Sequence, residues 1–172
     1  ASGKSVGEYS TRLKFRLDRS MPEDQALNMI LLRLLEIMQQ NTSGSIKGID
    51  TEFMHDYRIA LRKLRVVLKQ LALRYPEAVD TEYERFFTEL AKLTNPVRDL
   101  DVFLMQLENV QADLETPDGQ QLQALREYLL SSRAEAQGRL VKELKSSRYR
   151  QTIKQWRDHL KHSATENEAV DD

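Results

Sequence analysis

Two interleaved series of residues run with heptad spacing through residues 54–71. The apolar series is Met54, Tyr57, Leu61, Leu64, Leu68 and Leu71. The basic series, displaced by one residue, is His55, Arg58, Arg62, Arg65 and Lys69. Because side chains three and four residues apart share one face of an α-helix, the two series predict a helix on which an apolar stripe lies beside a cationic stripe.

A second apolar set flanks the cationic stripe on its other side. It consists of Ile59, Val66 and Leu73. A basic stripe on a helix is usually a solvated face, but here the cations are expected to lie between two apolar walls. A stripe placed in this way should face a groove or cavity. We therefore interpret it as a candidate anion-binding site.

Apolar residues recur at helical spacing along most of the chain, and no alternation of period two is sustained anywhere. The expected helices cover residues 21–40, 51–75, 80–95, 97–110, 120–144 and 148–160. Thr94, Asn95 and Pro96 interrupt the pattern, either by a kink or by a break with Asn95 as a new cap. Since the connections are short, the predicted fold is all-α, a helical bundle of five or six mostly antiparallel helices.

The chain divides into three segments by composition. The expected segments are a polar N-terminal lead-in at 1–20, the helical bundle at 21–162 and an acidic, disordered tail at 163–172. Within the bundle, the sequence NTSGSIKG at residues 41–48 has the composition of a loop. Asp50 or Thr51 is the expected cap of the basic helix, and Pro76 marks its end.

The composition excludes several classes of function. The 172 residues suffice for one domain with a substantial core. The absence of cysteine excludes disulfides, thiolate catalysis and cysteine-based metal sites. No run of about 18 apolar residues predicts a membrane span, so we expect a cytoplasmic protein with no membrane partner, and we expect no cofactor and no metal. Because the formal net charge is only −1, anion binding must depend on a local concentration of cations.

Three sequence blocks carry a resemblance to a known family. The block HDYRIALRKLRVVLKQL, residues 55–71, resembles the signature of the CHAD family, the conserved histidine α-helical domain, in which a His is followed by Arg three, seven and ten residues later. The block LTNPVRDLDVFL, residues 93–104, is similar to a second family block. A weaker similarity covers SSRYRQTIKQW, residues 146–156. The similarity extends over residues 21–160 with the blocks in the family's order.

The resemblance implies a helical fold that binds inorganic polyphosphate in a basic cavity, as a binding module rather than a catalyst. It also implies a location at polyphosphate granules. Full-length members of the family are usually nearer twice this size, with two related bundles and a second basic helix facing the first. The chain resembles the N-terminal half of such a protein. The facing wall is therefore expected from the last three helices of this chain (residues 97–110, 120–144 and 148–160), from a second CHAD-like half or from a homodimer.

A polyphosphate chain needs several fixed cations in a row. The basic stripe covers about 21 Å of helix axis, which follows several successive phosphates. Arginine suits this role because its planar fork binds two oxygens at once. His55 binds an anion best when protonated, so binding is expected to strengthen at mildly acidic pH. The expected binding residues are His55, Arg58, Arg62, Arg65, Lys69, Arg98, Arg126, Arg133 and Arg148.

Several assignments have alternatives. Asp99 and Asp101 either pair with the site arginines and hold them, or cap the helix after Pro96. Arg126 and Arg133, seven residues apart on one helix face, belong either to the site or to the general surface. Each alternative predicts different partners for these side chains in the folded protein.

Three other functions compete with polyphosphate binding. Nucleic-acid binding would use the same stripe and would also weaken with salt, but no aromatic residues are interleaved with the cations for base stacking. A phosphohydrolase, or an accessory domain of one, would need a metal–carboxylate cluster, and Asp99, Asp101 and His55 do not complete one. A purely structural helical adaptor would bind no polyanion at all.

Overall fold

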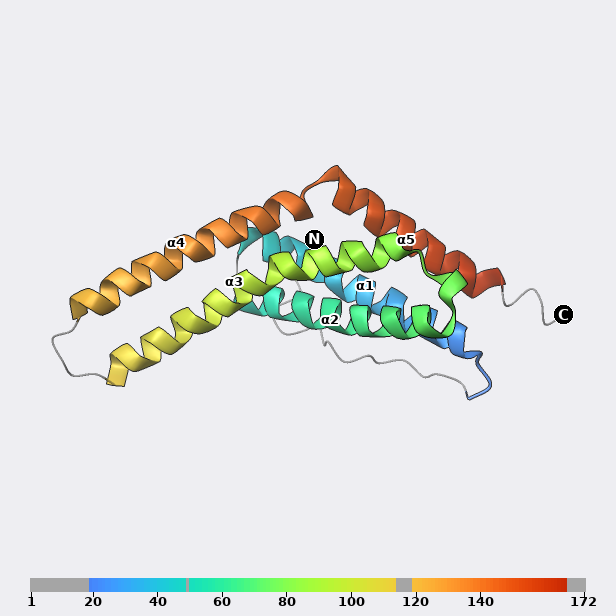
Figure 1. The fold of residues 1–172 in the computed structure, drawn as a ribbon, viewed down its shortest axis with the longest axis horizontal. Coiled ribbons are helices and arrows are strands. Elements are labelled where there is room, and N and C mark those ends of the chain that lie inside the picture. Colours follow the sequence, from blue (N-terminus) through green and yellow to red (C-terminus); the bar gives the residue numbers. More distant parts are fainter. Residues whose placement is uncertain (1–18, 49, 114–118, 167–172) are drawn as a thin grey trace, which may run out of the picture.

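The computed structural model describes residues 19–48, 50–113 and 119–166, and within these residues every regular element is helical (Figure 1). The elements are α1 (Glu23–Lys47), α2 (Thr51–Arg74), the short 3-10 helix η1 (Pro76–Ala78), α3 (Thr81–Asp113), α4 (Gly119–Leu144) and α5 (Ser147–Glu166). The prediction of an all-α bundle is confirmed. None of the described helices has an apolar stretch long enough to cross a membrane.

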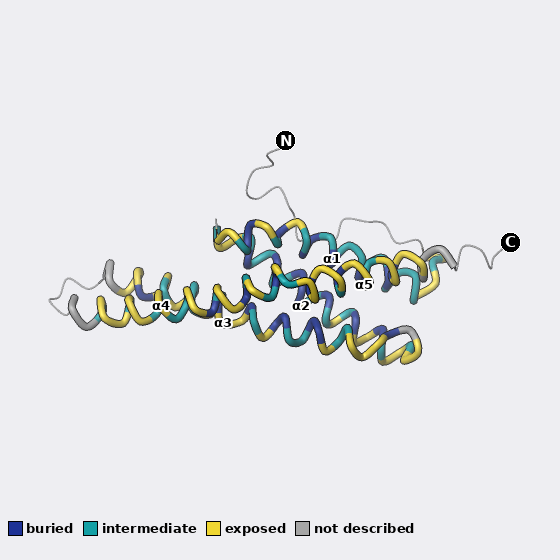
Figure 2. Tube along the Cα trace, turned by 90° about the horizontal axis from the view of Figure 1, so that it is seen from above, coloured by how far each residue is buried: buried dark blue, intermediate teal, exposed yellow. Residues whose placement is uncertain are grey.

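Four helices and the end of α4 surround the core, and a hairpin extends from it. α1 and α2 pack side by side, the first part of α3 packs on α2, and α5 packs on α1. α3 runs antiparallel to α2, continues past the N-terminal start of α2 and pairs with α4, so that the two form a protruding hairpin (Figure 1). Buried positions are concentrated where the four helices meet, whereas exposed positions dominate the hairpin (Figure 2). The core is therefore off-centre along the molecule.

The apolar stripe of α2 supplies the centre of this core. All six of its residues, from Met54 to Leu71, are at most 3% exposed. They join one apolar cluster with Leu34 of α1, Phe87 of α3 and Trp156 of α5. With this stripe turned inward, the cations one residue later are rotated by about 100° and lie beside α3.

The loop predicted for residues 41–48 is instead the last part of α1. Asn41 and Thr42 bond back to the carbonyl oxygens four residues earlier, at 2.8 and 2.9 Å, so their side chains do not compete with the helix. Gly44 is buried against the ring of Phe53 from α2. The helix ends at Gly48, whose φ of 60° is left-handed. Packing against α2 thus outweighs a composition typical of loops.

The close approach at Gly44 gives a prediction with an internal control. A Cβ at Gly44 would lie 2.3 to 2.6 Å from the Phe53 ring, so Gly44→Ala is expected to destabilise the protein by about 1–3 kcal/mol. Gly138 of α4 has no atom within 4 Å of such a Cβ, so Gly138→Ala is expected to stabilise by up to about 1 kcal/mol. Urea unfolding of both variants measures the two shifts. Equal shifts of the same sign would contradict the packing described here.

Of the two alternatives at Pro96, a kink or a break with Asn95 as a new cap, the structure excludes the break, because α3 is one helix with Pro96 inside it. Pro96 has no N–H to offer the preceding turn, but Val97 beside it is fully buried. The helix is held on both sides of Pro96, by α2 before it and by α4 after it. The number of α-helices in the described part is consequently five rather than six.

The expected boundaries of the basic helix agree with the structure. The expected lead-in and tail at the two chain ends lie only partly within the described residues. Asp50 caps α2 by accepting a hydrogen bond from the Glu52 N–H at 2.9 Å, and α2 ends at Arg74, just before Pro76. α5 continues to Glu166, into the segment expected to be a tail. Residues 1–18 and 167–172, which hold most of the expected lead-in and tail, lie outside the described residues.

Candidate functional site

A basic groove lies between α2 and α3. It has a volume of about 430 Å³. The charged residues that line it are His55, Arg58, Arg62, Arg65 and Arg98. The first four come from the basic stripe of α2, and Arg98 comes from the facing side of α3. The structure thus brings these five predicted residues together in one concave surface.

The arginines of the basic groove have no carboxylate partner within ion-pair distance among the described residues. Within the described residues, Arg62, Arg65 and Arg98 have no carboxylate oxygen within ion-pair distance, and the buried Nε of Arg65 has no acceptor. Arg58 donates to Asn95 Oδ1 at 2.8 Å, which is a neutral acceptor. Several arginines outside the groove differ in this respect. For example, Arg74 bonds Glu23 at 2.8 Å.

Mutual repulsion in the basic groove is visible at Arg58. Its burial lowers the pKa of the guanidinium below the usual value, Asp99 raises it, and the neighbouring Arg98 and Arg62 lower it further. Holding these cations close together therefore costs free energy in the unliganded protein. An anion placed among them would offset that cost.

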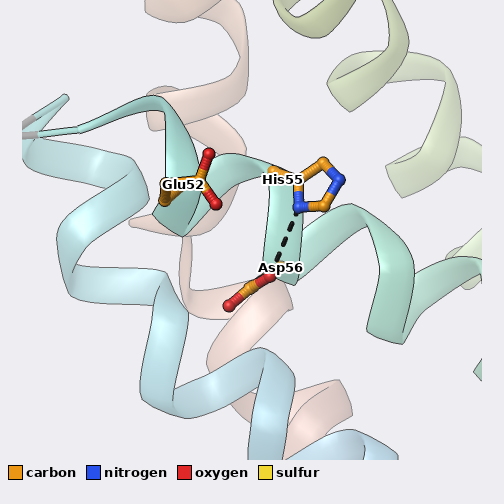
Figure 3. Close-up of side chains that lie close together, drawn as sticks. All are labelled: Glu52, His55 and Asp56. Atoms are coloured by element: carbon orange, nitrogen blue, oxygen red, sulfur yellow. Dashed lines mark hydrogen bonds and ion pairs between the residues drawn. The ribbon is translucent and has the colours of Figure 1, made fainter. Parts of the chain in front are cut away.

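His55 stands at one end of the basic groove, beside two carboxylates (Figure 3). Its Nδ1 lies 3.3 Å from Asp56 Oδ1. Ligand atoms of Glu52, His55 and Asp56 all lie within 4.8 Å of one another, a spacing at which they could share a divalent cation. This group is not among the sites predicted from the sequence, although its i, i+3, i+4 spacing on one helix was a usable signal.

Three predicted site arginines lie away from the basic groove. Arg133 of α4 bonds Asp101 at 2.9 Å, and Arg126 of the same helix lies 4.0 Å from Glu108. These pairs tie α4 to the second half of α3, and the two helices form the hairpin seen in Figure 1. Geometry thus separates Arg126 and Arg133 from the groove, and they hold the hairpin together instead.

The third of these arginines, Arg148, also has a carboxylate partner outside the basic groove. The aspartates that follow Arg98, Asp99 and Asp101, differ in the arginine on which each one acts. Arg148, at the start of α5, bonds Glu89 at 2.7 Å, and this bond raises the pKa of Arg148. Asp101 is used by Arg133, which does not line the groove. Asp99 is exposed and acts on Arg58 through its charge. Neither aspartate caps a helix, since α3 is continuous at this point.

The second apolar wall expected from Ile59, Val66 and Leu73 is mostly absent. Ile59 lines the basic groove, but Val66 and Leu73 are 58% and 75% exposed. The facing wall is instead provided by α3, through Ala91, Thr94 and Asn95 as well as Arg98. The periodicity of α2 predicts that these apolar residues share one face of the helix. It does not predict which other helix, if any, packs against that face.

Beyond Arg65 a second hollow, of about 630 Å³, continues between the same two helices. Its lining includes Lys69, which was predicted, and Arg85 and Lys92 of α3, which were not. Arg85 and Lys92 are seven residues apart and therefore share a face of α3. This spacing was a signal in the sequence, but nothing there showed that the face would lie opposite α2.

The geometry can be compared with known proteins. The sequence model of the CHAD domain family matches residues 29–171, which is most of the chain. No curated protein matches the chain at a significant level. The matched range contains the whole of α2, α3, α4 and α5, and with them both hollows. On this evidence the chain belongs to the CHAD domain family.

Proposed function

We propose that the chain binds inorganic polyphosphate, without catalysing its hydrolysis, in the basic groove between α2 and α3. The observation that carries the proposal is the row of groove arginines that have no carboxylate partner in the described residues, in a molecule whose formal net charge is only −1. A concentration of uncompensated charge in one groove favours an extended polyanion over a small neutral ligand. Membership of the CHAD family adds support, because CHAD domains are associated with polyphosphate binding.

The lining of the groove favours polyphosphate over nucleic acid. Arginine and lysine can bind the phosphates of either polymer. Single-stranded nucleic acids, however, also stack their bases on aromatic side chains. The residues that line the basic groove and the second hollow include no Phe, Tyr or Trp. The lining therefore matches a polymer that consists of phosphate alone.

Direct titration tests the proposal. We expect the wild-type chain to bind linear polyphosphate with an affinity that falls as salt is raised, because the phosphates release counterions on binding. Single-stranded and double-stranded DNA of equal charge should compete poorly. DNA that displaced polyphosphate at equal phosphate concentration would favour the nucleic-acid alternative.

Glu52, His55 and Asp56 could hold a metal ion at one end of the basic groove. A metal-dependent hydrolase is therefore tested by a separate assay of phosphate release. Wild-type protein with polyphosphate and Mg²⁺, Mn²⁺ or Zn²⁺ is expected to release no phosphate above the rate of the metal alone. Release that is lost in Asp56→Asn would contradict the non-catalytic proposal and would assign the reaction to this group.

A further inference from the structure

The second hollow lies next to the basic groove along the same two helices. The two share Arg65, which lines both. The lining of the second hollow is Arg65, Leu68, Lys69, Thr81, Glu84, Arg85, Thr88, Glu89 and Lys92. A ligand that leaves the basic groove past Arg65 therefore enters a second concave surface rather than open solvent.

Cations predominate in the second hollow. Lys69 and Lys92 are exposed and have no carboxylate within ion-pair distance in the described residues. Among the described residues, the one carboxylate within ion-pair distance of Arg85 is that of Glu82, at 3.6 Å, and both side chains are largely exposed. Pairs of this kind contribute little and leave the guanidinium available.

Two carboxylates also line the second hollow, and one of them is already compensated. Glu89 accepts a hydrogen bond from Arg148 at 2.7 Å, and this bond lowers the pKa of the Glu89 carboxyl. Glu84 has no such partner in the described part of the chain. Its charge is the one that an incoming phosphate chain would meet.

We propose that the second hollow is a further phosphate-binding compartment, in which Lys69 and Lys92 make the site prefer long polyphosphate chains to short ones. The inference rests on the proposed function. A short chain fills the basic groove alone, whereas a long chain continues into the second hollow. The contacts in the second hollow are then made by a chain that is already bound in the basic groove. They raise the affinity because no second ligand has to be captured from solution.

The test compares two ligands and two matched double variants. The ligands are tripolyphosphate and a linear polyphosphate of several tens of phosphates. The variants are Lys69→Gln/Lys92→Gln and the control Lys142→Gln/Lys154→Gln, which removes the same charge from exposed positions on α4 and α5 that line neither hollow. Titration calorimetry at several salt concentrations gives the affinity and its salt dependence for each combination.

The hollow variant is expected to lose about tenfold in affinity for the long chain and at most about twofold for tripolyphosphate, while the control changes neither. For the long chain, the slope of log K against log salt should become shallower by about 1.4, at about 0.7 for each lost phosphate contact on a flexible strand. Glu84→Gln should have the opposite effect and tighten binding of the long chain only.

The possible results distinguish a failure of the second compartment from a failure of polyphosphate binding itself. Equal losses for both ligands, or none in the hollow variant, would overturn the second compartment while polyphosphate binding stands. A wild-type chain that binds neither ligand would instead overturn the proposed function and the compartment with it. A length preference that persists in the hollow variant would also count against Lys69 and Lys92.

Discussion

Arg62→Gln is expected to weaken polyphosphate binding about 10- to 100-fold relative to wild type, the largest effect of any single substitution in the basic groove. Arg62 is exposed, lines the groove and has no carboxylate partner in the described residues. Its replacement therefore breaks no ion pair within the part of the chain that the structure describes. A bond between a charged donor and a phosphate oxygen is worth about 1.5–3 kcal/mol, which corresponds to this range of affinity.

A matched control makes this result specific. Arg150 of α5 is also exposed and lines neither hollow, so Arg150→Gln removes the same charge from another place. The control variant should bind polyphosphate as wild type does. Fluorescence competition at constant ionic strength measures both. If the two variants bound equally well, the groove would not be the binding site, and the charge of the protein as a whole would be the better explanation.

Leu64→Ala is expected to have the largest effect on stability, a loss of about 2–5 kcal/mol in the free energy of unfolding. Leu64 has no exposed surface and belongs to the core cluster formed with α1, α3 and α5. Truncation removes buried methyl groups and leaves a cavity among helices that are held by their other contacts. Urea unfolding followed by circular dichroism at 222 nm would report the loss.

Val66→Ala provides the comparison, because Val66 is two residues further along α2 and is 58% exposed. Its substitution should change the free energy of unfolding by no more than about 0.5 kcal/mol. If Val66→Ala destabilised the protein as much as Leu64→Ala, an unobserved surface would have to cover Val66. The prediction therefore tests which of the two apolar sets of α2 belongs to the core of the single chain.

The sequence predicted α2 well because its pattern is local and repeats over about five turns. Each core residue of the stripe except Leu71 is followed by a basic residue, so the two stripes reinforce one assignment of faces. The burial of the apolar stripe and the grouping of His55, Arg58, Arg62 and Arg65 follow from helical geometry alone.

The parts that were missed depend on contacts between distant residues. The end of α1 depends on Gly44 meeting Phe53, which composition cannot reveal. Arg126 and Arg133 were correctly placed on one helix, but the spacing along a helix does not say which neighbour it faces. Their partners, Glu108 and Asp101, are known only once α4 is seen to pack on the far part of α3.

The arrangement of α2 has a consequence for changes in its length. Deletion of one residue near Ala60 would bring Arg65 and Lys69 into the positions now held by Leu64 and Leu68, and so would push cations toward the interior. Insertion of one residue would instead carry the leucines toward the groove. Only changes of seven residues keep both alignments. Point substitutions can therefore alter ligand binding and folding separately, whereas an insertion or deletion in this helix changes both at once.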